Sequence, residues 1–380
     1  ALFWLIDMDF KTIVPVLASV VGALLFSLFL KSVLEAPFLF ATADKNDAVQ
    51  LSDFYSKIGD NSNVRSLSQD ITIISTDGID RKRMAELVSI VDSMQPKVLG
   101  MDIMFLSKQE GDEQLIAAIK ASPRIVLPYG LAENKKSDIY SFKDSCYFYD
   151  KLAKKKCGAV NLEGLSIKST IRVFKPEFKM QNGIIRNFAV EIARLYSNRS
   201  FENLKRREGV TDLINYHGVD FMEIPWEEVL KGKDASLIKN KIVLLGTTAS
   251  YADIHCTPVK AEMPGVYIQA YTVNTIIKER YVNQVCPMVN YLIAVLFSLV
   301  FCSYVYYVRQ NVKYIGRLLI RICQLLLMIL FLFTGTYLYL KTNTYVNFSL
   351  ALSMIGSSLL MLDIVSGLYW LYIKFSHFSK

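Results

Sequence analysis

The residues best suited to chemistry in this sequence form a closely spaced pair, Asp253 and His255. An Asp-x-His pair can ligate a metal ion, but a metal site needs a third and usually a fourth ligand. Between the long apolar segments at the two ends of the chain, the only other histidine is His217. The alternative is a hydrogen-bonded loop, in which Asp253 and Thr257 hold the backbone ahead of Pro258. We expect this loop rather than a metal centre or a catalytic site.

A turn that contains glycine precedes this pair. Gly246 follows the apolar run KIVLL and opens the segment GTTAS, so it stands where an open α/β sheet binds its ligands. The spacing does not match G-x-G-x-x-G and no Walker-type lysine follows, so nucleotide binding is not indicated. We expect Gly246, Thr247 and Thr248 to form a tight turn, whose amides and hydroxyls could also hold a small anion.

Two more carboxylates accompany predicted strands. Asp77 follows the run DITIIS, and Asp102 lies within the apolar run KVLGMDIMF, where a carboxylate needs a partner or a cleft. Because the carboxyl ends of parallel strands share one edge of a sheet, we expect Asp77, Asp102 and Asp253 to converge there. We expect a ligand-binding site without a cofactor, a metal or enzyme activity. Its predicted residues are Asp77, Asp102, Gly246, Thr247, Thr248, Asp253 and His255.

Alternating strands and helices must hold these residues in place. Short β-branched runs alternate with stretches whose apolar residues keep helical spacing, which implies parallel pairing through helical crossovers. We expect an α/β domain built on a mostly parallel or mixed sheet. The predicted strands cover 70–75, 97–105, 124–128, 212–216 and 241–245, and the predicted helices cover 80–95, 112–121, 184–196 and 264–278.

The composition also points to a membrane. Of the 380 residues, 52% are hydrophobic, and the mean hydropathy is +0.28 although 21% of the residues are charged. A helix that crosses the hydrocarbon core needs about 20 mostly apolar residues. Four transmembrane α-helices are therefore predicted, at 13–30, 288–308, 318–340 and 346–373.

These four segments divide the chain into three parts. The first is long for a signal peptide, and no small-x-small cleavage site follows it, so we expect a retained anchor. The predicted parts are an N-terminal anchor at 1–31, an extracytoplasmic α/β domain at 32–287, and a three-helix region with a short tail at 288–380.

Positive charge sets the predicted orientation. Most basic residues close to the apolar segments flank one side, so the positive-inside rule places both termini in the cytoplasm and residues 32–287 outside. The formal net charge is +8, yet residues 31–287 hold 35 basic and 32 acidic residues. Most of the excess therefore belongs to the membrane-spanning part, and no nucleic-acid partner is expected. The orienting residues are Lys11, Arg309, Lys313, Arg317, Arg321, Lys374 and Lys380.

Four blocks of sequence carry a family resemblance. They are KVLGMDIMF with Asp112 and IVLP, then GAVN with Arg172, then NYHGVDFMEIPWEEVLKGK, and finally residues 237–277, which include GTTAS and ADIHCTP. In this order they resemble the second type of CHASE domain, an extracytoplasmic sensory module found with bacterial cyclases, histidine kinases and serine/threonine kinases. The resemblance covers about residues 65–280 and extends to the one helix before and the three helices after this region.

This resemblance implies a function in sensing. An effector domain often follows the three helices in the family, and none follows them in this sequence. We therefore expect a sensory, ligand-binding or protein-binding protein of the bacterial inner membrane that acts through a separate partner. The alternative is a structural or accessory subunit of a larger inner-membrane complex. The expected partners are the lipid bilayer and other membrane or envelope proteins, in a homo- or hetero-oligomer.

One carboxylate lies inside a predicted membrane helix. Ten residues separate Asp363 from Lys374, which is about 15 Å along a helix, and an unpaired charge at that depth is costly. We expect Asp363 to face protein and to pair with Arg321, which lies one turn into the preceding helix from the same side. A protonated Asp363 that is hydrogen-bonded to another subunit is the alternative.

The cysteines outside the apolar segments allow three pairings. The sequence favours a disulfide between Cys146 and Cys157, which would close the loop before GAVN. The alternatives are a bond between Cys256 and Cys286 and four free thiols.

Overall fold

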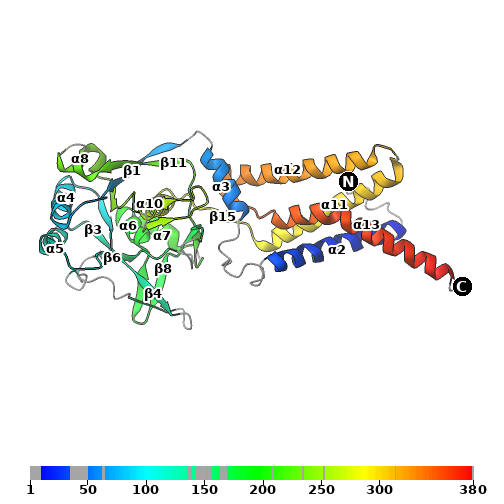
Figure 1. The fold of residues 1–380 in the computed structure, drawn as a ribbon, viewed down its shortest axis with the longest axis horizontal. Helices are drawn as coiled ribbons and strands as arrows, with labels where there is room; N and C mark the ends of the chain where they lie inside the picture. The colour runs from blue at the N-terminus through cyan, green and yellow to red at the C-terminus, as the bar shows by residue number, and fades with distance from the viewer. Residues whose placement is uncertain are drawn as a thin grey trace. The chain divides into compact units, whose positions relative to one another are not determined.

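The structure, a computed structural model, consists of two compact units. Ala1–Tyr55 and Asn283–Lys380 form one unit, which holds the long apolar helices, and Ser56–Val282 form the α/β unit (Figure 1). Residues 51–55, which the sequence assigns to the outer domain, therefore group with the apolar helices. The structure describes residues 10–34, 50–61, 65–134, 139–142, 152, 156–162, 169–207, 209–232, 235–250, 253–312 and 314–378.

A six-stranded parallel sheet forms the centre of the α/β unit. Its strands follow the order β11-β1-β12-β2-β3-β6, and every neighbouring pair is parallel. Helices supply the crossovers that parallel pairing requires between β1, β2 and β3. The predicted fold class is confirmed. The strands are β1 (Ser66–Ser75), β2 (Val98–Asp102), β3 (Ile125–Tyr129), β6 (Lys156–Ala159), β11 (Val219–Pro225) and β12 (Ile242–Gly246).

Helices cover both faces of this sheet, so its central strands are apolar on both sides. In β1, Ile71 and Ile73 point into one core and Ile74 points into the other, and all three are fully buried. Helices α6, α7 and α10 build the first core, whereas α4, α5, α8 and α9 contribute to the second (Figure 1). The helices are α4 (Arg81–Ser93), α5 (Asp112–Ala121), α6 (Phe188–Tyr196), α7 (Asn198–Lys205), α8 (Trp226–Leu230), α9 (Ala235–Ile238) and α10 (Gly265–Ile277).

The sheet contains two strands that were not predicted from the sequence, β6 and β11. The predicted strand at 212–216 contributes only β10 (Asp212–Leu213), which pairs with β7 (Val173–Phe174) outside the main sheet. The strand that joins the sheet is β11, which pairs with β1. Its sequence, VDFMEIP, lacks the continuous apolar run of the buried strands, because β11 lies at an edge of the sheet.

A smaller sheet extends from the α/β unit as an arm (Figure 1). Its last strand, β9 (Gly183–Arg186), occupies residues that the sequence analysis assigns to a helix. The helix α6 begins only at Phe188, because the side chain of Asn187 caps it by accepting a 2.9 Å hydrogen bond from the Ala189 amide. The predicted helix at 184–196 is therefore four residues too long. The other strands are β4 (Leu131–Asn134), β5 (Ile139–Phe142) and β8 (Glu177–Met180).

Two glycines let helices approach the sheet closely. A Cβ on Gly158, in β6, would lie 2.8 Å from the backbone nitrogen of Phe188 and closer still to its Cα. A Cβ on Gly246, at the end of β12, would lie 2.7 Å from Cβ of Val266. Because Phe188 is the first residue of α6 and Val266 is the second residue of α10, these glycines set how closely the start of each helix approaches the sheet.

Four helices of the other unit are long and apolar enough to cross a membrane, as predicted. Small polar side chains join them: Ser353 donates to Ser27 at 3.0 Å, and the hydroxyls of Ser298 and Ser358 lie 3.3 Å apart. The buried amide of Gln324 donates to a backbone carbonyl of the last helix at 2.9 Å. Such residues permit close approach of helices in lipid. The helices are α2 (Phe10–Leu34), α11 (Pro287–Asn311), α12 (Gly316–Thr342) and α13 (Ser349–Phe378).

The structure gives Asp363 a different partner from the predicted one. Asp363 Oδ1 lies 2.7 Å from Nη1 of Arg309, at the end of α11, whereas Arg321 donates to Gln324 at 3.2 Å. The reason is that α11 packs along α13 much more extensively than α12 does. The Asp363 side chain is also 61% exposed within the chain, so it does not face the interior of the helix bundle.

The disulfide predicted between Cys146 and Cys157 is not tested, because Cys146 lies outside the described residues. In the part of the chain that the structure describes, the thiols of Cys256 and Cys286 are free. The alternative bond between Cys256 and Cys286 is therefore absent from this structure.

The close contact at Gly158 predicts that even a methyl group will destabilise the α/β unit. We expect Gly158→Ala to lower its free energy of unfolding by about 1–3 kcal/mol, because the new Cβ overlaps backbone atoms of Phe188. Urea unfolding in lipid nanodiscs, followed by the fluorescence of the buried Trp226, measures this change. An unchanged unfolding midpoint would show that α6 and β6 lie further apart than the structure has them.

Candidate functional site

The carboxylate of Asp77 closes the turn that follows β12. Its Oδ2 accepts hydrogen bonds from the amides of Thr248 and Ala249, both at 3.0 Å, and from the hydroxyl of Ser75 at 2.8 Å. Burial alone would raise the pKa of Asp77, but these donors together with the Thr248 hydroxyl lower it below its ordinary value. Asp77 is therefore an ionised carboxylate that holds the turn.

This contact decides what the turn can bind. The amides of Thr248 and Ala249, which could have held an external anion, are occupied by the protein's own Asp77. Gly246 ends the strand, Thr247 follows it, and the chain bends at Thr248 and Ala249.

The hydroxyl of Thr248 connects Asp77 to a second carboxylate, Glu223 of β11. Thr248 Oγ1 lies 2.9 Å from both Asp77 Oδ2 and Glu223 Oε1, and its single proton cannot serve both oxygens fully. The hydroxyl of Tyr267, in the first turn of α10, donates to the other oxygen of Glu223. Burial and then this hydrogen bond raise the pKa of Tyr267, so Tyr267 stays protonated. The contacts of Glu223 are exposed to solvent.

Asp102 ends β2 in a different environment. The strand register places it beside Gly246, which pairs on its other side with Ser75. Burial, and after it the negative charge of Asp253, raise the pKa of Asp102 to about 8. A carboxyl group with this pKa is mostly protonated at neutral pH and can donate a hydrogen bond.

Asp253 and His255 lie next to the start of α10. Asp253 Oδ1 is 3.1 Å from His255 Nε2, and both side chains are partly exposed. The carboxylate also rests against Gly265, the first residue of α10, where a Cβ would lie 2.5 Å from Oδ2. His255 belongs to β13 (Ile254–His255), which pairs with β14 (Met263–Pro264).

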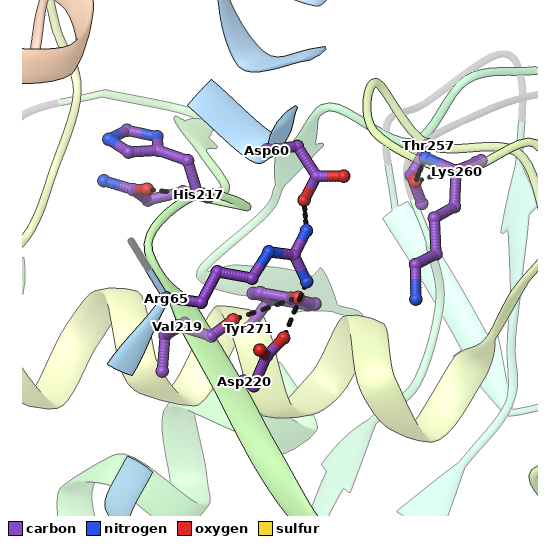
Figure 2. A network of polar contacts seen from close by, with 9 residues as sticks. Asp60, Arg65, His217, Val219, Asp220, Thr257, Lys260 and Tyr271 are labelled. Atoms are coloured by element: carbon purple, nitrogen blue, oxygen red, sulfur yellow. Dashed lines mark hydrogen bonds and ion pairs between the residues drawn. The ribbon is translucent and has the colours of Figure 1, made fainter. Parts of the chain in front are cut away.

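The loop between these two strands is held by its own hydrogen bonds. The hydroxyl of Thr257 donates to the Lys260 carbonyl at 2.9 Å and accepts from the Lys260 amide at 3.1 Å (Figure 2). The predicted hydrogen-bonded loop is therefore observed at Thr257. Among the described residues, no group of three or more His, Cys, Asp or Glu side chains is placed to hold a metal ion.

The structure thus brings the predicted residues to one edge of the sheet, but in two groups. Asp77 and Thr248 are joined by a hydrogen bond after β12, whereas Asp253, near the start of α10, acts on Asp102 through its negative charge. Sequence reasoning missed Glu223 and Tyr267. The sequence offered one signal for Glu223. Val219, Phe221 and Glu223 are spaced two residues apart, and residues with this spacing lie on the same face of a strand.

A second polar network lies at the other end of β11. Arg65, which precedes β1, donates to Asp220 Oδ1 at 2.6 Å and forms an ion pair with Asp60, so its guanidinium lies between two carboxylates (Figure 2). Nearby, the hydroxyl of Tyr271 donates to the Val219 carbonyl at 3.3 Å. Asp60 belongs to α3 (Leu51–Asn61), so this network ties the end of α3 to β11 and, through β11, to α10.

The environment of Asp102 predicts a specific pH dependence. Its pKa is about 8 in the folded protein and about 3.9 in an unfolded chain, so between these values the folded state holds a proton that the unfolded state releases. Asp102 therefore lowers the stability of the α/β unit as the pH rises from about 4 to 8, by at most about 1.4 kcal/mol per pH unit. We expect Asp102→Asn to gain stability over wild type as the pH is raised, in urea unfolding at pH 5, 6.5 and 8.

Glu202→Gln, at a half-exposed carboxylate of α7, is the control for this measurement. It should keep the wild-type pH dependence. A constant difference between Asp102→Asn and wild type across this range would contradict a raised pKa at Asp102.

Comparisons with known proteins agree with this architecture. The family model described as the CHASE2 domain matches residues 59–304, which include the whole α/β unit from β1 onward and most of α11. No characterised protein and no solved structure gave a significant match. CHASE2 domains are extracytoplasmic sensory domains, and four apolar helices flank this one, which makes the protein membrane-anchored. The chain belongs to the CHASE2 domain family.

Proposed function

We propose that this protein is a sensor whose outer domain binds a small molecule at the carboxyl edge of the central sheet. The apolar helices then pass the signal to a separate partner protein, because they are the part of the chain that can reach a membrane partner. The observation that carries this proposal is the exposed polar edge itself. It combines Glu223 and Thr248 with Tyr267 in a domain of a sensory family.

The charges of this edge favour one class of ligand. Glu223 and Asp253 are partly exposed carboxylates, while Thr248 and Tyr267 add hydroxyl groups. Carboxylates accept hydrogen bonds from amines and hydroxyls and repel anions. We therefore propose an amine-bearing or hydroxyl-bearing ligand rather than a phosphate or a carboxylate.

Binding rather than catalysis is proposed for this edge. The ionised Asp77 is held by four donor groups, and the hydroxyl of Tyr267 is engaged by Glu223. A general base needs a free carboxylate within reach of a substrate proton, and a nucleophile needs such a base beside it. The proposed site supplies hydrogen-bonding groups and charge instead.

We propose that the protein lies in a bacterial inner membrane, with both termini in the cytoplasm and the CHASE2 domain outside. Support comes from the charge of the short flanks, since Arg309, Arg317 and Arg321 all lie at the same end of α11 and α12. Tyr337 and Lys341 lie toward the opposite end of α12.

An accessory role in a larger complex is the second candidate function. It is favoured by α12, whose outer face carries large apolar side chains that no other part of the described chain covers. A partner helix, from another protein or from a second copy, could pack on this face as readily as lipid. The exposed residues are Leu318, Ile322, Leu325, Leu326, Ile329, Leu330, Phe333 and Tyr337.

The sensor proposal predicts that ligands will stabilise the α/β unit. A panel of amines, amino acids, polyols and sugars is screened by thermal unfolding of the full chain in nanodiscs. A ligand at about 100 times its Kd adds about 2.7 kcal/mol, which corresponds to a rise in Tm of several degrees. Glu223→Gln and Tyr267→Phe should each weaken binding about tenfold, the loss expected for one hydrogen bond to a charged group.

The control for this screen is Glu202→Gln, which lies on α7 away from the edge and should bind as wild type does. Equal affinity in Glu223→Gln and wild type would exclude this edge as the site. Copurification from native membranes separates the two candidate functions, since a kinase or cyclase partner supports sensing and a transport or secretion assembly supports the accessory role.

The proposed orientation predicts opposite labelling of two exposed positions. In a variant that lacks the exposed Cys286, we expect a membrane-impermeant maleimide to label Val210→Cys in intact cells, because Val210 lies in the outer domain and is 74% exposed. Tyr314→Cys, in the loop after α11 and 97% exposed, should react only after the membrane is opened. The reverse pattern would overturn the proposed orientation.

A further inference from the structure

The helix α3 exposes two large apolar side chains, whereas its buried face consists of Tyr55 and small residues. Ser52, Tyr55, Ser56 and Gly59 form its buried face. On the outer face, Phe54 is 44% exposed and Ile58 is 38% exposed, with Lys57 between them. A helix at a water-exposed surface turns its apolar residues toward the protein and its polar residues toward water. The exposed apolar residues of α3 therefore indicate an apolar neighbour on its outer face.

The contacts of Tyr55 show at which level of the membrane α3 begins. Tyr55 is fully buried, and its ring lies 5.9 Å from that of Tyr339 and 6.2 Å from that of Tyr345. Its hydroxyl rests against Gly335 of α12 so closely that Gly335 has no room for a Cβ. These contacts lock the first half of α3 onto the last two turns of α12 and the short strand β16 (Thr344–Tyr345).

The charges of α12 relate this position to the bilayer. Arg321 and Lys341 are the charged residues that bound its apolar segment, and the 20 residues from one to the other span about 30 Å, the thickness of the hydrocarbon core. Gly335 lies about 9 Å before Lys341 along the helix. The Tyr55 hydroxyl therefore lies about 9 Å inside the boundary between hydrocarbon and headgroups. Its ring also lies beside Tyr345, beyond the end of α12, so Tyr55 spans this boundary, and Phe54 precedes it in sequence.

We propose that α3 is an interfacial helix, with Phe54 and Ile58 in contact with the acyl chains of the lipids and Lys57 directed toward the lipid phosphates. Phe54 and Ile58 are four residues apart and so share one face of the helix. Lysine between them extends its charge to the headgroups while its stem stays in apolar surroundings. The contacts of Tyr55 favour lipid as the neighbour of this outer face, because they bring α3 to the boundary between hydrocarbon and headgroups.

Lipids that carry bromine near the headgroup end of their acyl chains test this proposal. Single tryptophans are introduced as Phe54→Trp and Ile58→Trp in the full chain, with Trp4 and Trp370 replaced by Phe and Trp226 retained as a constant signal. Both substitutions put an aromatic ring on an already exposed face, so the helix is expected to tolerate them. In nanodiscs of brominated phosphatidylcholine, we expect each to lose about half or more of its added emission relative to unbrominated lipid.

Two control positions bracket the result. Phe333→Trp, on the exposed face of α12, should be quenched by brominated lipid, and Val210→Trp, on the α/β unit, should not be quenched. Quenching of Phe54→Trp and Ile58→Trp only to the level of Val210→Trp overturns the proposal. Quenching by aqueous iodide instead of by bromine would show that the face lies in water. Protection from both quenchers would show that a protein covers it, and either outcome also overturns the proposal.

Discussion

The insertion of β12 between β1 and β2 is the pairing on which the rest of the α/β unit depends. It brings Ser75, Gly246 and Asp102 into register at the carboxyl edge, although these residues are far apart in the sequence. It also fixes α10, because the chain leaves β12 at Gly246 and returns to begin the helix with Val266 packed against that glycine. A strand that is buried on both faces must be apolar throughout, and β12 meets this condition with five buried residues in succession.

The polar groups at this edge divide into those that complete the fold and those that remain available. Asp77 compensates for its burial with four donor groups from its own strand end and from the turn after β12. Asp102 lacks such compensation and faces the charge of Asp253, so its pKa moves in the opposite direction. Glu223 and Tyr267 lie at the exposed side of the same edge. A ligand would meet this second set, which is why the proposed binding site differs from the list that the sequence suggests.

The boundary between the two units falls within α3, after Tyr55. The first half of this helix packs through Tyr55 against α12 and β16. Its second half ends at Asp60, which pairs with Arg65, and Arg65 in turn pairs with Asp220 of β11. The same edge strand carries Glu223 of the candidate site.

Patterns that are local in the chain were sufficient for much of this structure. Four apolar segments predicted the membrane helices, the β-branched runs predicted β1, β2, β3 and β12, and the ordered blocks identified the CHASE2 family. Each of these predictions rests on residues that are close together in the chain. Burial of a helix or strand requires apolar residues in a continuous or periodic run, and such a run can be read from the sequence.

The tertiary structure alone decided which distant groups meet. It assigned Asp77 to the turn after β12, placed Glu223 against Tyr267, and gave Asp363 the partner Arg309 instead of Arg321. It also moved the start of the predicted helix at 184–196 four residues later, to Phe188, because β9 pairs with β8 before it. Such contacts depend on strand order, register and helix packing, and a pair of polar residues that are 44, 54 or 171 positions apart leaves no periodic signal in the sequence.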